Sequence, residues 1–307
     1  MTTLFCSETC DFVTDMNQVQ MTIDVPPMLD QVILSDSRVL QNMMLEELMM
    51  TKQDYCFNVQ SNIAPHMRKI VTDWMLEVCE DQQCQPEVFF LSVNYLDRFL
   101  STVNINKNQF QLCASVCILL ASKFSQVVPI TTEKLVIYTD NSVTVEELRQ
   151  WEIKILNVLQ WELSSVTTHS FLEHFIPGLS LSSKVNIPKV RRHAETIAAL
   201  AATEYKFILA KQSVIAAAAL AAAVKGLVKD QTETEHVVNS LAARIKCQSS
   251  EIMFYVQHLD HYVEQLVTPQ QCSQDSFLLS FSSVYTCKGD GSTTPTDTVR
   301  ASNAVAA

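Results

Sequence analysis

The scarcity of glycine constrains this chain more than any other feature of its sequence. Only four of its 307 residues are glycine, and none precedes Gly178, whereas average usage is about 7%. Loops that bring backbone close to phosphate, such as P-loops, dinucleotide-binding fingerprints and kinase Gly-rich loops, therefore cannot exist in residues 1–177. Tight β-hairpin turns also favour glycine. The sequence predicts an all-α protein.

Composition narrows the class of protein further. A hydrophobic content of 48% supplies ample material for a core. The formal net charge is −11, and no long segment has the basic excess that binds nucleic acid, so the acidic N-terminal region favours a basic protein partner. Ten cysteines are present without any CxxC pair. With no signal peptide in the sequence, we expect reduced thiols in an intracellular protein.

Prolines and capping residues divide the middle of the chain into helical segments. Apolar residues recur at helical spacing after Pro65, and Pro86 opens another helix at a favoured first position. Residues 112–124 are apolar nearly all round, which predicts a buried central helix. Thr144 and Glu147 form a capping box that opens a further helix.

The second half repeats this plan at an offset of roughly 100 residues, with Lys225 in the place of Lys123. We therefore expect two tandem five-helix repeats with an extra N-terminal helix and disordered termini. The expected units are an acidic leader (1–34), an N-terminal repeat (35–165), a C-terminal repeat (166–267) and a Ser/Thr-rich tail (268–307).

Catalytic and metal-binding patterns find little support. No serine lies in the Gly-x-Ser-x-Gly motif of a nucleophile elbow. No pair of carboxylates suggests general acid–base catalysis rather than an ordinary solvated helix face. His258, His261 and Glu264 share a helix and could hold a metal with one more ligand, but a polar helix face explains them more simply. We expect no enzymatic activity, no metal and no cofactor.

Three features invite a functional interpretation. Lys123 lies at the end of the apolar central helix. Its side chain could reach a partner, or it could simply interact with the partial negative charge at the helix C-terminus. A stripe from Met67 to Trp74, with Glu77 one turn on, could pack in the core or form a groove for an apolar-plus-Arg peptide. Leu4, Cys6 and Glu8 put three side chains on one face of an extended leader peptide.

Several blocks of sequence resemble the D-type cyclins. The match covers about residues 35–265 and returns in the tail at TPTD (294–297). The blocks are MRKIVTDWMLEVCE (67–80), NYLDRFL (94–100), ASK (121–123), EKL (133–135) and IYTDNS (137–142).

The resemblance implies two cyclin-box repeats and an activating subunit of a G1 cyclin-dependent kinase, which directs phosphorylation of retinoblastoma-type proteins and promotes the G1/S transition. It implies a nuclear and cytoplasmic location. The family's Lys–Glu pair that grips the kinase maps to Lys123 and Glu152, with apolar contacts from Phe124, Trp161 and Leu163. Pressing on the kinase's mobile helix would complete the kinase's own Lys–Glu ion pair.

Further sites follow from the same resemblance. Leu4, Cys6 and Glu8 match the motif that binds the retinoblastoma pocket, and Thr294 before Pro295 matches a proline-directed phosphorylation site. The family's docking patch for Arg-x-Leu (RxL) peptides of substrates and kinase inhibitors maps to Met67, Ile70, Trp74, Glu77 and Gln111.

The chain also departs from the D-type pattern. Ser125 and Gln126 stand where the family has a lysine and a glutamate, and Ala114 replaces a family glycine. Loss of that carboxylate removes one charge available to a kinase. The alternative interpretation is a cyclin-fold scaffold or transcription regulator that does not activate a kinase, and a basic face would favour it.

Overall fold

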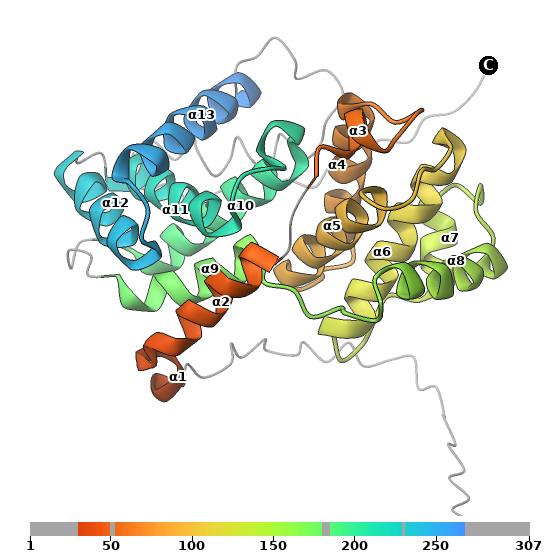
Figure 1. Cartoon of the computed structure of the whole chain (residues 1–307), viewed down its shortest axis with the longest axis horizontal. Helices are drawn as coiled ribbons and strands as arrows, with labels where there is room; N and C mark the ends of the chain where they lie inside the picture. Colours follow the sequence, from red (N-terminus) through yellow and green to blue (C-terminus); the bar gives the residue numbers. More distant parts are fainter. Residues whose placement is uncertain (1–29, 50–52, 180–184, 229–230, 268–307) are drawn as a thin grey trace, which may run out of the picture.

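The computed structural model describes residues 30–49, 53–179, 185–228 and 231–267, and regular structure within these ranges is helical. Two groups of five α-helices lie side by side, with α2 near their junction (Figure 1). The first group contains α4 (Pro65–Asp81), α5 (Pro86–Leu100), α6 (Phe110–Ser125), α7 (Thr132–Tyr138) and α8 (Val145–Val158). The second contains α9 (Thr168–Phe175), α10 (Ile187–Thr203), α11 (Gln212–Val228), α12 (Gln231–Ile245) and α13 (Ser249–Val267). Equivalent helices begin about 100 residues apart, which confirms the predicted all-α tandem repeat.

Local signals in the sequence start these helices. Pro65 and Pro86 lie in the first turns of α4 and α5. Thr144 and Glu147 form the predicted capping box of α8, since the Thr144 hydroxyl accepts from Glu147 N at 3.2 Å and Glu147 Oε2 accepts from Thr144 N at 2.9 Å. The Thr131 hydroxyl caps α7 by accepting from Lys134 N.

The third helix of each repeat forms the centre of its core. Helix α6 packs against α4, α5 and α8, whereas α11 packs against α9, α10, α12 and α13. Helix α11 is buried over the run from Ser213 to Val224, in which alanine predominates, so its small side chains let four neighbouring helices approach closely. None of the helices in the described ranges is both long and apolar enough to cross a membrane.

Three short elements precede the first repeat: α1 (Gln31–Ser35), α2 (Ser37–Met49) and α3 (Tyr55–Asn58). The extra helix that the sequence predicted is α2, and Asp36 opens it, because its carboxylate accepts from Arg38 N at 2.9 Å. All of helix α1 except Ser35 lies within the segment that the sequence assigned to the leader, and the helix begins after Asp30, whose side chain accepts from Val32 N at 2.8 Å.

Candidate functional site

The two charged side chains singled out from the sequence form an ion pair at the surface. Lys123 lies in the last turn of α6 and Glu152 lies on α8, and the distance from Lys123 Nζ to Glu152 Oε1 is 2.6 Å. The lysine side chain is 45% exposed and the glutamate side chain 16% exposed. The more buried carboxylate therefore holds the ammonium in place while two of its three N–H donors remain directed elsewhere.

Large apolar side chains lie exposed close to this pair in the chain. Phe124 follows Lys123 directly and is 51% exposed, and Trp161 in the turn after α8 is 62% exposed. Trp161 has a φ of 62° and donates from Nε1 to Asn157 Oδ1 at 3.3 Å. Leu163 is half-buried, and its carbonyl accepts from the Tyr95 hydroxyl at 2.7 Å.

Phe124, Trp161 and Leu163 line one open groove of about 830 Å³. Its walls come from α2, α5, the end of α6, the end of α8 and residues 161–164. Exposed apolar surface of this kind marks interaction sites in soluble proteins. The structure thus brings the three predicted apolar residues together in a groove beside the ion pair. Other residues lining the groove include Glu46, Met49, Arg98 and Val158.

Sequence reasoning missed three further apolar side chains near the pair. Val127 and Val128 follow α6 in an exposed loop, and Ile153 follows Glu152 on the outer side of α8; all three are exposed. The available signal was a pair of β-branched residues directly before Pro129, a place where a loop would ordinarily be polar.

The residues of the docking patch lie on α4 and at the start of α6, two helices that pack against each other. Ile70 is 66% exposed and Glu77 is exposed, whereas Met67, Trp74 and Gln111 are half-buried. Core packing therefore explains part of the stripe, because Met67 and Trp74 contact the core. The outer edge formed by Ile70 and Glu77 remains accessible.

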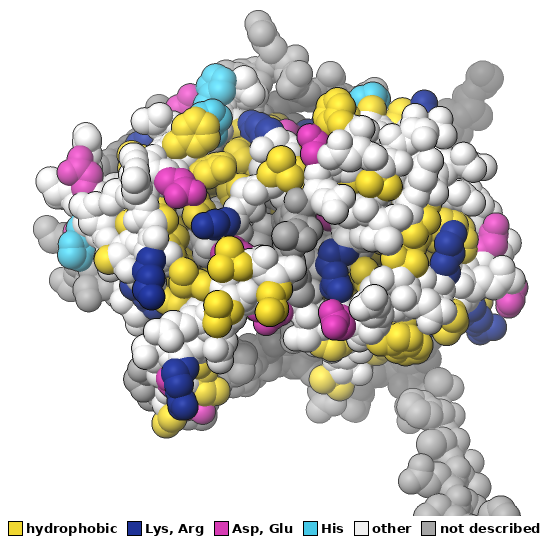
Figure 2. Space-filling model, viewed as in Figure 1, with side chains coloured by type: hydrophobic (Ala, Val, Ile, Leu, Met, Phe, Trp, Pro, Cys, Tyr) yellow, Lys and Arg dark blue, Asp and Glu magenta, His cyan; other side chains and the backbone are white. Residues whose placement is uncertain are grey.

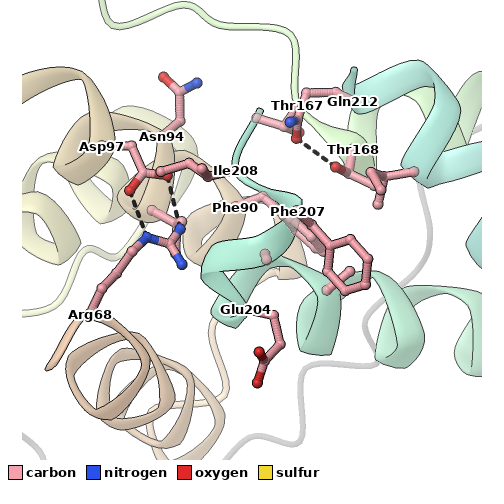
Figure 3. A pocket seen from close by; sticks show the side chains of 14 residues that line it. Arg68, Phe90, Asn94, Asp97, Thr167, Thr168, Glu204, Phe207, Ile208 and Gln212 are labelled. Atoms are coloured by element: carbon pink, nitrogen blue, oxygen red, sulfur yellow. Dashed lines mark hydrogen bonds and ion pairs between the residues drawn. The ribbon is translucent and has the colours of Figure 1, made fainter. Parts of the chain in front are cut away.

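A buried polar cluster that the sequence did not reveal joins the two repeats (Figure 3). Arg68 on α4 donates from Nε and Nη2 to the two carboxylate oxygens of Asp97 on α5, each at 2.9 Å, and from Nη1 to the Thr203 carbonyl at 3.0 Å. A cavity of about 30 Å³ lies beside it. Asn94 also lines this cavity, and its Oδ1 has no hydrogen-bond partner among the described residues. A cavity of this size has room for one buried water.

The second repeat carries a counterpart of the surface ion pair. Lys225 at the end of α11 and Asp260 on α13 are 2.6 Å apart, with side chains 51% and 29% exposed. In sequence, however, Gly226 follows Lys225 where Phe124 follows Lys123. The same charge pair therefore lacks the adjacent aromatic side chain.

One group of potential metal ligands lies elsewhere in the described residues. His169, Glu173 and Glu195 have ligand atoms within 4.8 Å of one another. Arg191 forms ion pairs with both glutamates and already supplies positive charge there. The sequence candidates His258 and His261 contact the Phe254 carbonyl and Gln265 instead. Leu4, Cys6, Glu8 and Thr294 lie outside the described residues.

Comparison with known proteins identifies the class. The cyclin N-terminal domain matches residues 38–164, and the cyclin C-terminal domain matches residues 166–284. A viral cyclin from herpesvirus saimiri superposes with a TM-score of 0.67 at 25% identity, over 74% of this chain and 97% of the viral chain. The fold is therefore that of a cyclin with two tandem boxes.

Curated relatives place the chain within that class. It is 41% identical to G1/S-specific cyclin-D1 of Xenopus laevis over 274 residues, which cover 88% of this chain and 93% of the relative. It is 50% identical to G1/S-specific cyclin-D1 of Danio rerio over 208 residues, 67% of this chain and 70% of the relative. Identity to G1/S-specific cyclin-D3 of Homo sapiens is 47% over 64% of this chain and 68% of the relative. The chain belongs to the cyclin family and, within it, to the D-type cyclins.

Proposed function

We propose that this protein is the regulatory subunit that activates a G1 cyclin-dependent kinase and thereby promotes the G1/S transition. The observation that carries the proposal is the Lys123–Glu152 ion pair, held at 2.6 Å beside the groove of Phe124 and Trp161. Membership of the D-type cyclins supplies the class of partner.

The geometry suits a helix of the kinase. The last four carbonyls of a helix lack partners within the helix, and its C-terminus carries a partial negative charge. The Lys123 ammonium, oriented by Glu152, can donate to such carbonyls. The exposed rings of Phe124 and Trp161 can receive the apolar side of the same helix.

Activation then follows from where that helix is held. A protein kinase is active only when a lysine of its β3 strand pairs with a glutamate of its αC helix. A cyclin that binds the inward position of αC more tightly than the outward position shifts the kinase towards the active state. In this account the cyclin contributes position and the kinase contributes the catalytic groups, so the protein itself needs no enzymatic activity and no cofactor.

Substrate choice is a second part of the proposal. Ile70 and Glu77 offer an apolar contact and a carboxylate on one helix, the chemistry that an Arg-x-Leu peptide requires. We propose that this patch binds such peptides in substrates and kinase inhibitors. Leu4, Cys6 and Glu8 are proposed to bind the retinoblastoma pocket, and Thr294 to be phosphorylated. A protein with these partners would work in both nucleus and cytoplasm.

The alternative, a cyclin-fold scaffold or transcription regulator without kinase activation, is not favoured. On the face of the molecule that Figure 2 shows, the Lys and Arg side chains are dispersed among Asp and Glu and do not form one basic patch. The net charge of −11 also opposes contact with nucleic acid.

Reconstitution tests the proposal. Purified protein is mixed with a purified G1-class cyclin-dependent kinase, and phosphorylation of a retinoblastoma fragment is measured against the kinase alone. We expect a stable complex and a large rise in the rate of phosphorylation. A stable complex without increased activity, or the absence of any complex, would contradict the proposal and favour the alternative.

A further inference from the structure

Helix α4 ends in a turn that brings two cysteines together. Cys84 N donates to the Cys79 carbonyl at 2.8 Å, Gln83 N donates to the Glu80 carbonyl at 2.9 Å, and Gln83 has a φ of 51°. These bonds define a Schellman motif, in which the side chains at the two ends of the longer bond meet. Here both positions are cysteine, so the turn places the two thiols side by side.

The two thiols differ in environment. Cys79 is buried and Cys84 is half-buried, so a small oxidant reaches Cys84 first. The neighbouring Cys79 thiol lowers the pKa of the Cys84 thiol, and the Gln126 side chain and the Lys134 ammonium add to this, against the effect of burial. The Cys84 thiol and burial raise the pKa of the Cys79 thiol. A partly accessible thiol with a lowered pKa beside a second thiol is the arrangement of a redox-sensitive pair.

We propose that Cys79 and Cys84 form a modification site that a peroxide converts into an intramolecular disulfide. The Cys84 thiolate attacks the O–O bond of hydrogen peroxide, which yields a sulfenic acid on Cys84 and hydroxide. The Cys79 sulfur then attacks the sulfenic sulfur and releases hydroxide, which takes the Cys79 proton to form water. Overall, two thiols lose two electrons and two protons, and one peroxide becomes two waters.

Gln126 connects this pair to the end of α6. Its side chain lowers the pKa of the Cys84 thiol, and its Oε1 accepts from the Ser122 hydroxyl at 2.9 Å. Ser122 precedes Lys123 and also accepts from Ile130 N at 2.6 Å, so it closes the loop after α6. A carboxylate at position 126 would repel a Cys84 thiolate, whereas the glutamine side chain is uncharged. The glutamine of this chain therefore favours the reactive form of Cys84.

The chain contains its own control pair. Cys113 and Cys117 also lie one helical turn apart, but both are fully buried inside α6. Residues four apart on a helix have Cβ atoms about 5–6 Å apart, whereas a disulfide needs about 3.8 Å. A disulfide between them would require α6 to unwind, so peroxide should leave this pair reduced.

Peptide mapping tests the proposal. The full-length protein is reduced, treated with hydrogen peroxide, alkylated, cleaved after Glu80 and analysed by mass spectrometry. We expect a Cys79–Cys84 disulfide that a thiol reductant reverses, with Cys113 and Cys117 alkylated. Cys79→Ser should instead leave a sulfenic acid on Cys84 that a dimedone probe traps.

Gln126→Glu provides the matched variant, because it leaves both thiols in place. It should slow oxidation of Cys84 by roughly three- to tenfold, since the thiolate fraction falls. Circular dichroism checks that each variant keeps the helical content of the parent. Absence of the disulfide, or equal oxidation of the α6 pair, would overturn the proposal; an unchanged rate in Gln126→Glu would overturn the role of Gln126.

Discussion

Arg68 and Asp97 form a two-pronged ion pair inside the protein, with both N···O distances at 2.9 Å. Arg68 is only 2% exposed, and its Nη1 donates to the Thr203 carbonyl at the end of α10. The Tyr55 hydroxyl donates to Asp97 Oδ1 at 2.9 Å. A single buried charge pair therefore connects α4, α5, α3 and the second repeat.

Removing one charge of this pair should be costly. Asp97→Asn leaves the Arg68 charge buried without its counter-ion, so we expect the free energy of unfolding to fall by about 3–5 kcal/mol. Urea denaturation measures the change. The control is Asp260→Asn, which breaks an exposed ion pair and should cost less than about 1 kcal/mol. Similar losses in the two variants would show that the buried pair is not a principal link between the repeats.

Helix α2 is anchored by a carboxylate in addition to the partly buried side chains of Leu40, Met43 and Met44, which pack against the core. None of its residues is buried, and Glu47 accepts from Ser213 N at 2.7 Å and from the Ser213 hydroxyl at 2.8 Å, at the start of α11. Glu47→Ala removes this cap and should cost about 1 kcal/mol. Hydrogen exchange should accelerate in α2, whereas the exposed control Asn42→Ala should leave it unchanged. Unchanged exchange in Glu47→Ala would mean that other contacts hold the helix.

A substitution at Ile70 can test peptide binding to the docking patch with little effect on the stability of the protein. Because its side chain is 66% exposed, Ile70→Ala should change the free energy of unfolding by no more than about 0.5 kcal/mol. Binding of an Arg-x-Leu peptide should weaken by about tenfold, as measured by fluorescence anisotropy. The exposed Ile137→Ala, on α7, is the control. Equal peptide affinity in all three proteins would place the peptide site elsewhere.

Glu87 should make stability depend on pH. Burial raises the pKa of Glu87 to about 7, against hydrogen bonds from Thr167 and Ser170 that lower it. Because the folded pKa exceeds the unfolded value, the native state favours the protonated form, and this stabilisation is lost as pH rises from about 4.5 to 7. Glu87→Gln imitates the protonated form. Between pH 4.5 and pH 7.5, the free energy of unfolding of this variant should rise by about 2 kcal/mol relative to that of the parent, as measured by urea denaturation at each pH.

His169 gives the opposite slope and serves as the comparison. Burial, with a smaller effect of Arg191, lowers the pKa of His169 to about 4. Its folded pKa lies below the unfolded value, so stability is lost as pH falls from about 6.5 to 4. His169→Gln should therefore gain stability relative to the parent on acidification. Parallel pH profiles for the two variants would contradict the assignment of these shifts to burial.

Local chemistry made much of the fold predictable from the sequence. The prolines that open α4 and α5, and the capping box of Thr144 and Glu147, act within a few residues and keep the same role in the structure. The Lys123–Glu152 contact was expected from the resemblance to the family, because helical spacing alone does not pair two different helices.

Contacts between distant segments were not predictable in this way. Glu47 and Ser213 are separated by 166 residues, and their contact depends on how α2 crosses the second repeat. In the sequence, Arg68 lies among the residues of an amphipathic helix and resembles an ordinary exposed arginine. Only the structure shows that it is buried and paired with Asp97. Cys79 and Cys84 meet because Gln83 has a positive φ. This conformation is uncommon for residues other than glycine, so the sequence does not predict it.

The affinity of the G1-class kinase for two matched variants tests the central claim most directly. Lys123→Glu and Lys225→Glu each reverse one charge of an exposed ion pair with the same 2.6 Å separation. Isothermal titration calorimetry should show binding at least about 30-fold weaker for Lys123→Glu, which corresponds to about 2 kcal/mol, and parental affinity for Lys225→Glu. Parental affinity in Lys123→Glu, or equal losses in both variants, would contradict the claim that the first repeat grips the kinase through Lys123.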